Sequence, residues 1–363
     1  MLAALAALLF GMTAPLLKKA SAGVGPLLAG ALLYMGAAAG AGLMALGRQR
    51  RRGARAGLAA DEASAIVDGA GARPAAITSQ MLGRFVLVAI VGAAAAPALL
   101  VAGLARTDGA TASLLLALEA PFTLALAWIF LHEFIGGRVL AAALLILGGG
   151  AALVAASFGS SLAISGTALV AAAALAWAFD NLFSRPLADR DPLTVVVYKG
   201  LLGALASGVA GALAGESRPP AVNALPLLLI GAIGYGLSLQ LYLRAQRLVG
   251  AARTASVFAV APFAGVVVAL LFTDMRGAAW PGAQLPVAAV LVGAGLWLHL
   301  TERHEHFHHH DALEHDHLHE HADGHHAHHH EPMPAGAHSH RHLHDAVTHG
   351  HDHSEDLHHR HRH

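Results

Sequence analysis

Ten long apolar stretches take up most of the first 300 residues of this chain. They cover residues 1–17, 24–47, 82–105, 110–131, 138–158, 162–183, 193–213, 223–243, 251–272 and 283–300. A helix that crosses the hydrocarbon core of a bilayer needs about 20 mostly apolar residues, and these stretches reach or approach that length. Helices satisfy all their backbone polar groups internally, as lipid requires. The sequence therefore predicts an all-α membrane protein with ten transmembrane helices.

The overall composition narrows the function classes. Hydrophobic residues make up 56% of the chain and charged residues 13%, and Lys+Arg and Asp+Glu both number 23, so no net charge favours nucleic acid. The absence of cysteine excludes disulfides and thiolate metal sites. His132-Glu133 begins like a zinc-protease motif, but Gly136 stands where that motif needs its second histidine. We therefore expect a protein that is not an enzyme and requires no cofactor.

Basic residues between the spans predict the orientation. One side of a ten-span chain carries Arg48, Arg50, Arg51, Arg52, Arg55, Arg73, Arg138, Arg185, Arg190, Arg244, Arg247 and Arg303. The other side carries only Lys18, Lys19, Arg106, Arg218 and Arg276. Because cytoplasmic loops hold the excess of Lys and Arg, both termini are expected in the cytoplasm. The prediction is a multi-pass membrane protein.

The first half of the apolar region recurs in the second half. Gly109-Ala110 and Ala120-Pro121-Phe122 return 141 residues later as Gly250-Ala251 and Ala261-Pro262-Phe263. Five spans are an odd number, so the two halves have opposite orientations, and inverted repeats of this kind are a transporter architecture. We expect the first repeat over residues 1–158, the second over 159–300 and a separate tail over 301–363.

The residues of these repeats resemble a known family. The stretch from Ala112 to Phe122, with Trp128, His132-Glu133 and Gly148-Gly149-Gly150, resembles the EamA repeat that defines the drug/metabolite transporter superfamily. Residues 177–181, 198–200 and 298–304 are similar to a bacterial branch whose members also end in a His-rich tail. The second half departs from the repeat at Asp274, where the family usually has Glu. The resemblance implies a secondary transporter that moves a small solute by alternating access.

Glu119 is the strongest candidate for a functional residue inside the membrane. It lies nine residues into the span 110–131 and so near mid-bilayer. Intramembrane ionisable residues are costly and usually face a cavity or a partner. Glu119 is therefore predicted to carry a proton or bind a cation, and the alternative is an internal ion pair or a hydrogen-bond anchor between helices.

A second polar group lies in the next helical hairpin. Asp180 and Asn181 end the span 162–183, and Tyr198 and Lys199 begin the following one. Adjacent helices of a hairpin bring Asp180 and Lys199 within reach of each other, which neutralises both charges. The pair is either a structural salt bridge or part of a substrate site.

Three further polar residues complete the predicted cavity. Thr13 and Gln240 lie within spans, and their hydrogen-bonding groups either line the path of a polar solute or form interhelical hydrogen bonds. Lys18 either extends its ammonium to the lipid headgroups or lines the cavity mouth, where it favours anionic substrates. The cavity is thus predicted to include Thr13, Lys18, Glu119, Asp180, Asn181, Tyr198, Lys199 and Gln240.

The tail is rich in histidine. Residues 301–363 hold 25 of the 27 histidines, and His132 and His299 are the other two. With few apolar residues the tail is expected to be disordered. In extended backbone, residues i and i+2 point the same way, so His-x-His pairs offer two imidazoles to one metal ion. The predicted ligands are His304, His306, His308, His315, His317, His319, His321, His338, His340, His342 and His344.

Three interpretations of the tail remain open. It collects a metal that the body transports, it senses or buffers Zn, Ni, Co or Cu ions and regulates another transport activity, or it responds to pH. The runner-up to a solute transporter is a divalent-metal exporter fed by the tail, and the third alternative is a metal-buffering membrane protein without transport. The expected partners are membrane lipid and a small-molecule or ion substrate, not nucleic acid, and a homo-oligomer stays open.

Overall fold

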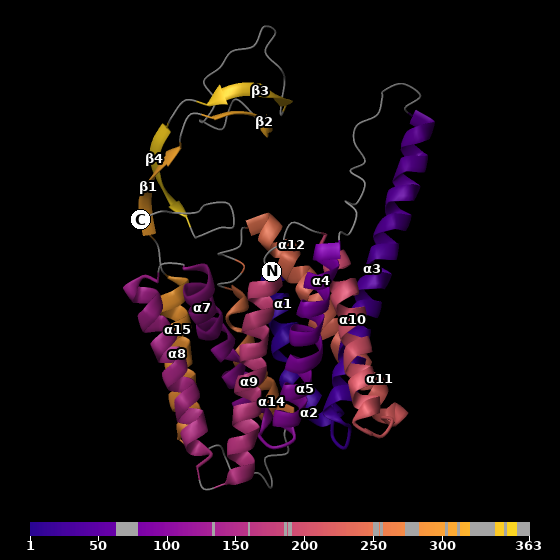
Figure 1. The fold of residues 1–363 in the computed structure, drawn as a ribbon, viewed down its shortest axis with the longest axis vertical. Helices are drawn as coiled ribbons and strands as arrows, with labels where there is room; N and C mark the ends of the chain where they lie inside the picture. The colour runs from indigo at the N-terminus through magenta and orange to yellow at the C-terminus, as the bar shows by residue number, and fades with distance from the viewer. Residues whose placement is uncertain are drawn as a thin grey trace. The chain divides into compact units, whose positions relative to one another are not determined.

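Figure 1 shows the computed structural model of the chain. It describes residues 1–62, 79–132, 135–158, 160–184, 187, 191–249, 254, 257–272, 283–301, 304–310, 313–319, 338–344 and 347–353. The chain divides into two compact units, Met1–Thr301 and Glu302–His363. The described part of the first unit is helical, and the described part of the second consists of strands.

The helices of the first unit follow the apolar stretches of the sequence. Up to residue 158 they are α1 (Leu2–Gly11), α2 (Thr13–Ala20), α3 (Pro26–Glu62), α4 (Ser79–Val88), α5 (Ala96–Leu104), α6 (Gly109–Leu115), α7 (Glu119–Leu131) and α8 (Gly137–Ala156). Beyond it they are α9 (Ser161–Ser184), α10 (Pro192–Leu213), α11 (Ala221–Ile230), α12 (Ser238–Val249), α14 (Ala261–Phe272) and α15 (Gln284–Leu300).

The described helices account for all ten predicted spans. Eight helical segments are at least 18 residues long and apolar enough to cross a bilayer, and two shorter apolar helices cover Ala261–Leu271 and Gln284–Leu300. The outer surface agrees with contact to lipid, because large side chains such as Leu144, Leu205 and Val290 are more than half exposed. The all-α membrane fold class is therefore confirmed for this unit.

Several spans are interrupted helices. The first consists of α1 and α2, which meet at Met12, and α6 continues through a 3₁₀ turn, η2 (Leu116–Leu118), into α7. Each half also contains one seven-residue π-helix, η1 (Ala89–Ala95) between α4 and α5, and η4 (Gly231–Leu237) between α11 and α12. Short π-helical segments within α-helices occur frequently at functional sites, so these segments mark where polar groups are to be sought.

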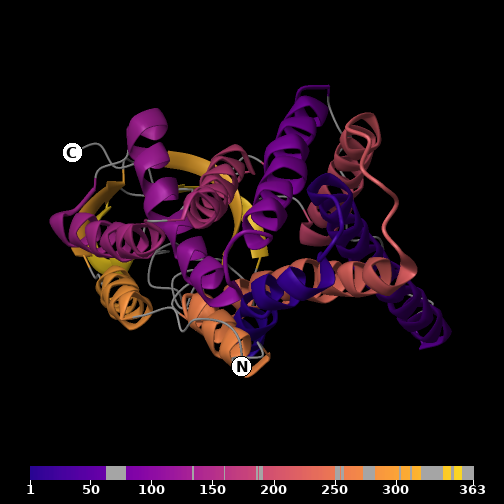
Figure 2. The same cartoon turned by 90° about the horizontal axis from the view of Figure 1, so that it is seen from below.

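Glycine lets the helices of the unit approach closely, as helix pairs in lipid do. Helices α8 and α15 lie side by side (Figures 1 and 2). A Cβ atom at Gly149 would lie 3.0 Å from the Ala288 carbonyl oxygen, and one at Gly295 would lie 2.7 Å from the Ala142 carbonyl oxygen. Larger residues at these two positions would force α8 and α15 apart.

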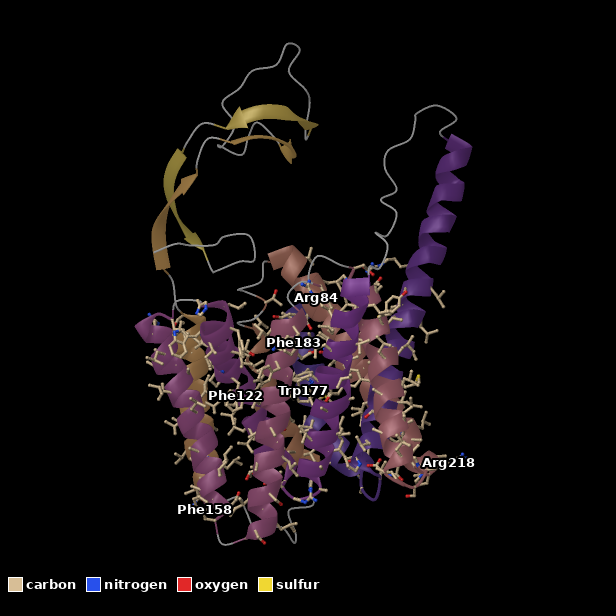
Figure 3. The ribbon with its side chains drawn as sticks, in the orientation of Figure 1. Arg84, Phe122, Phe158, Trp177, Phe183 and Arg218 are labelled. Atoms are coloured by element: carbon tan, nitrogen blue, oxygen red, sulfur yellow. The ribbon has the colours of Figure 1, made fainter. Side chains whose placement is uncertain are left out.

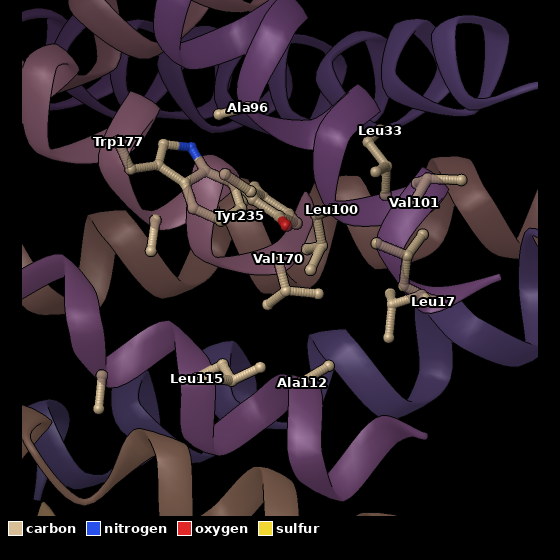
Figure 4. Packing of buried hydrophobic residues seen from close by; sticks show 14 of the residues in the cluster. Leu17, Leu33, Ala96, Leu100, Val101, Ala112, Leu115, Val170, Trp177 and Tyr235 are labelled. Carbon is tan, nitrogen blue, oxygen red and sulfur yellow. The ribbon is translucent and has the colours of Figure 1, made fainter. Parts of the chain in front are cut away.

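The core of the unit lies where helices from both halves meet. Leu17, Leu100, Leu115 and Val170 are fully buried in it, and Trp177 and Tyr235 extend the same cluster (Figure 4). In the side-chain view, Trp177 lies at a level between Arg84 and Arg218, which are near opposite ends of the helices (Figure 3). Aromatic side chains therefore fill the middle of the helical unit.

The structure describes four strands in the second unit, β1 (His304–His310), β2 (Leu313–His319), β3 (His338–His344) and β4 (Val347–His353). β1 pairs with β4 and β2 with β3, both antiparallel. The physical reason lies in the His-x-His alternation, whose period of two residues is that of a strand. Composition alone did not account for this backbone pairing.

Candidate functional site

A cavity of about 430 Å³ lies within the helical unit. Its lining comes from α1, α2, α6, η2, α7, α9, α12, α14 and α15, and from Phe258 and Ala259 just before α14. The polar lining residues are Ser113, Glu119, Thr123, Asn181, Tyr242 and His299, and the larger apolar ones are Phe10, Leu116, Phe258, Pro262, Leu296 and Leu300. The cavity thus reaches from the end of α15 to the first residue of α7.

Glu119 is the carboxylate of this cavity. It is half-buried, and it begins α7 directly after the 3₁₀ turn η2. Asn181 on α9 donates a hydrogen bond from Nδ2 to Glu119 Oε1 at 2.8 Å, and the same amide nitrogen lies 3.5 Å from Thr123 Oγ1. The Asn181 amide therefore fixes the position of a carboxylate that belongs to the other half of the chain.

Asp180 forms the ion pair with Lys199 that the hairpin predicts. The carboxylate of Asp180 is buried, and its Oδ2 accepts a hydrogen bond from Lys199 Nζ on α10. Oδ1 of Asp180 has no hydrogen-bond partner among the described residues. A Cβ atom at Gly92 would lie 2.1 Å from this Oδ1, so the π-helix η1 leaves space for the carboxylate only because residue 92 is glycine.

Two aromatic side chains bind the same π-helix. Tyr34 Oη donates a hydrogen bond to the Gly92 carbonyl oxygen at 2.8 Å, and Trp177 Nε1 donates to it at 3.0 Å. Tyr235, which belongs to the other π-helix, lies beside both, with ring centroids 5.6 Å from Tyr34 and 6.4 Å from Trp177 (Figure 4). The two π-helices therefore meet through a buried aromatic layer.

A row of aromatic rings connects this layer to the cavity. Ring centroids lie 5.9 Å apart between Tyr235 and Phe10, 5.6 Å between Phe10 and Phe258, and 4.9 Å between Phe258 and Tyr242. Phe10, Phe258 and Tyr242 line the cavity, whereas Tyr235 is buried. The wall of the cavity is thus aromatic on the side that leads to the buried layer.

The carboxylates of Glu119 and Asp180 belong to one electrostatic cluster. Glu119 interacts electrostatically with both Asp180 and Lys199. Two consecutive residues of α9 make the contacts with this cluster. Asn181 donates a hydrogen bond to Glu119, and Asp180 accepts one from Lys199. Residues that lie 61 positions apart in the sequence are thus brought together by α9.

The remaining predicted cavity residues lie elsewhere. Lys18 Nζ donates to the carbonyl oxygens of Leu104 and Thr107, each at 2.7 Å, so its ammonium group caps the end of α5 instead of facing the cavity. Tyr198 is exposed and packs its ring 5.7 Å from that of Phe85. Neither side chain is among the lining residues.

Thr13 and Gln240 are buried close to the cavity without lining it. Thr13 Oγ1 donates to the Phe10 carbonyl oxygen at 2.6 Å, while its neighbours Gly11 and Ala14 line the cavity. Nε2 of Gln240 has no hydrogen-bond partner among the described residues. Neither side chain is part of the described cavity lining.

Sequence reasoning missed His299 and the aromatic wall. His299 lines the cavity together with Glu119. One signal for it was available, since His299 is one of the two histidines outside the tail. Phe10 and Phe258 carried no such signal, because apolar residues are abundant in every span. Trp177 is buried, and its Nε1 donates a hydrogen bond to the Gly92 carbonyl oxygen.

Metal ligation is limited in the part of the chain that the structure describes. Within it no group of three or more His, Asp or Glu side chains is placed to hold one metal ion. The tail histidines on β1, β2 and β3 are described by backbone register alone, and His321, Glu133 and Asp274 lie outside the described residues. The described cavity contributes two potential ligands, Glu119 and His299.

The family of the chain follows from a comparison with known protein families. Residues 1–155 and 164–301 each match the EamA-like transporter family. The chain belongs to the EamA-like transporter family. Phe10 and Glu119 lie in the first matched region and Asn181, Tyr242 and His299 in the second, so the cavity of this EamA-like transporter lies between the two matched regions. The resemblance of the two halves to the EamA repeat is confirmed.

A solved structure supports the EamA-like fold. The match is titled "Crystal structure of protein", with a TM-score of 0.54 and 21% sequence identity, and it covers 83% of this chain and 97% of the other. At this identity the likeness concerns the fold alone. No curated protein matches the sequence of this EamA-like transporter.

Proposed function

We propose that the chain is a secondary transporter that moves a small solute across a bacterial inner membrane by alternating access. The observation that carries the proposal is the position of Glu119, the carboxylate of a mostly apolar cavity whose lining comes from both matched regions. A carboxylate in that environment is costly unless a proton, a cation or a bound solute compensates it. Glu119 is accordingly the residue that couples solute movement to an ion, or binds the solute itself.

The buried aromatic layer is proposed to be the barrier that closes the transport path beyond the cavity. Tyr34, Trp177 and Tyr235 are buried next to the Asp180–Lys199 ion pair. Alternating access requires a barrier that the solute crosses when one half moves against the other. The two π-helices that hold this layer come from opposite halves, so a relative movement of the halves rearranges it. We propose repeats over residues 1–158 and 159–300, with both termini in the cytoplasm.

The tail is proposed to bind transition-metal ions and to regulate or buffer, not to form the transport route. The strand registers favour this role, because His304, His306 and His308 are paired with His353, His351 and His349. On β2 and β3, His315, His317 and His319 are paired with His342, His340 and His338. Residues directly opposite in an antiparallel pair share one face. Imidazole suits Zn, Ni, Cu and Co ions, so each strand pair carries six candidate ligand residues.

A divalent-metal exporter is the second candidate function. His299 favours it, since an imidazole in the same cavity as Glu119 is the kind of ligand that a metal route needs. The described cavity offers two such ligands, fewer than the three or four protein ligands typical of zinc sites. The solute transporter is therefore the better supported proposal.

Solute counterflow in proteoliposomes tests the proposal. The full chain is reconstituted and screened against a panel of metabolites and metal ions, beside Glu119→Gln and a chain truncated after Thr301. We expect counterflow of an organic solute that Glu119→Gln abolishes and the truncation preserves. Metal-ion flux that depends on the tail would favour the exporter instead. Absence of Glu119-dependent flux for every compound would overturn the transporter proposal and leave a metal-buffering membrane protein.

A further inference from the structure

The charged residues of the cavity lining indicate the charge of the solute that it binds. Among the described residues that line it, Glu119 is the carboxylate, and neither lysine nor arginine is present. The lysine next to it in space, Lys199, is paired with Asp180 and does not line the cavity. A carboxylate in a lining that holds neither lysine nor arginine repels anions and attracts cations. The described lining therefore selects against carboxylates and phosphates.

The rest of the wall selects against small inorganic ions. Phe10, Leu116, Phe258, Pro262 and Leu296 give the cavity a mostly apolar surface. A hydrated metal ion gains nothing from such a surface, and its lost water must be replaced by several protein ligands. The cavity of about 430 Å³ falls within the range of about 300–1,000 Å³ found for sites of small organic ligands. Its size and its surface thus fit a solute with a carbon skeleton.

The aromatic rings add a specific preference for an organic cation. Phe258 lies at the centre of the wall, with Tyr242 at 4.9 Å and Phe10 at 5.6 Å between ring centroids. The faces of aromatic rings attract cations, and clusters of rings recognise ammonium groups. Glu119 faces the same space, with its Oε1 held by Asn181. A carboxylate and three aromatic rings that line one cavity offer the groups that bind a substituted ammonium.

We propose that the cavity binds a monovalent organic ammonium ion with an apolar body, its charge at Glu119 and the Phe10, Phe258 and Tyr242 rings around it. This inference rests on the proposed transport function, whose solute it assigns to a chemical class. It does not depend on the tail. The rings contribute about 0.5–2 kcal/mol at exposed to desolvated sites, which corresponds to an affinity change of roughly 2- to 30-fold.

Three compounds with one skeleton test the proposal. Phenylbutylamine is a cation at neutral pH, phenylbutanol is uncharged and phenylbutanoate is an anion. Binding of each to the purified full chain is measured by isothermal titration calorimetry at pH 7. We expect the amine to bind at least tenfold more tightly than the alcohol and the carboxylate to bind most weakly. Equal affinity for the amine and the alcohol, or no binding of the amine, would overturn the proposal.

Variants assign the binding to the proposed groups. Glu119→Gln is expected to weaken amine binding at least tenfold and to leave alcohol binding unchanged, which also reports that the cavity remains folded. Phe258→Leu keeps an apolar side chain and is expected to lose roughly 2- to 30-fold for the amine alone. Glu216→Gln changes an acid outside the cavity lining and is the matched control. Unchanged amine affinity in Glu119→Gln would contradict the assignment.

Competition by nickel ions and the counterflow assay distinguish the remaining outcomes. If nickel ions displace the amine from the wild type and bind in a Glu119-dependent manner, the cavity is a metal site and the proposal is wrong. If the amine does not bind while another solute shows Glu119-dependent counterflow, the substrate class is wrong and the proposed transport function stands. If neither amine binding nor counterflow depends on Glu119, both proposals fail.

Discussion

Asn181 donates a hydrogen bond of 2.8 Å to Glu119, and this bond joins the second half of the chain to the first. Asp180, the preceding residue of α9, is ion-paired with Lys199 on α10. Two consecutive residues of one helix thus contact both Glu119 and Lys199. Movement of α9 changes the surroundings of Glu119 and of the ion pair at the same time, which is a requirement for coupling ion binding to a change of conformation.

Removal of the Asn181 amide is predicted to impair transport more than stability. A hydrogen bond to a charged group contributes about 1.5–3 kcal/mol, so Asn181→Ala is expected to lower Glu119-dependent counterflow about tenfold or more. Asn181 is exposed to the cavity, so the melting temperature should change little. Ser165→Ala, an exposed position on the same helix, serves as the control. Equal counterflow in both variants would contradict the role of Asn181.

The charges of Asp180 and Lys199 are predicted to stabilise each other strongly in the folded protein. Removing one partner of a buried pair leaves the other charge unpaired and costs about 3–5 kcal/mol. Asp180→Asn and Lys199→Met should each destabilise the protein by this order, and the double variant should lose much less than the sum. Thermal unfolding in detergent measures the cycle. Additive losses would mean that the two charges do not stabilise each other.

The glycine of the first π-helix is predicted to be required for this pair. Gly92→Ala places a methyl group where Oδ1 of Asp180 now lies, because the two atoms would be 2.1 Å apart. We expect a lower melting temperature and a loss of transport. Gly83→Ala is the matched control on the preceding helix, since nothing lies within 4 Å of a Cβ atom there. The account is contradicted if both variants melt at the same temperature.

Much of this fold is predictable from the sequence, since span length and inverted repetition are properties of the chain itself. The ten apolar stretches coincide with the described helices. Glu119 is predictable for the same reason, as a lone carboxylate in an apolar span is costly. The Asp180–Lys199 pair follows from the geometry of one hairpin.

The cavity wall was less predictable, because it depends on contacts between distant segments. Phe10 and Phe258 lie 5.6 Å apart as ring centroids although nearly the whole transporter separates them in sequence. Lys18 shows the opposite case, since a lysine at a span end has several local explanations and only the tertiary structure reveals the carbonyl groups of Leu104 and Thr107. The His-His register of the tail strands also needs long-range pairing.

Glu216 is predicted to stabilise the start of α3 without taking part in transport. Its two carboxylate oxygens accept hydrogen bonds from the Leu27 and Leu28 amides, at 3.1 and 2.8 Å. These amides belong to the first turn of α3, where helical donors have no partners of their own. Glu216→Ala is expected to cost about 0.5–2 kcal/mol of stability, measured by thermal unfolding, with counterflow retained. Loss of transport at full stability would give Glu216 a functional role.

Metal binding by the tail is predicted to depend on pH. Unperturbed imidazole titrates near about pH 6.5, and only its neutral form binds a metal ion. Nickel or zinc binding to the full chain, measured by equilibrium dialysis, should therefore be present at pH 7.5 and largely lost at pH 5.5. The chain truncated after Thr301 should lose most of this binding at both pH values. Binding that persists in the truncated chain would place the metal in the helical unit.

The absence of cysteine in the natural sequence allows the most direct measurement of the cavity. Ala120 lines the cavity and Ala125 is exposed on the same helix outside the cavity lining, so single cysteines at these positions differ in their access to water. A charged, membrane-impermeant thiol reagent is applied to membranes from the cytoplasmic side. We predict rapid labelling of Ala120→Cys, slowed by the transported solute, and little labelling of Ala125→Cys. Equal, solute-independent labelling of the two cysteines would contradict a substrate cavity at Glu119.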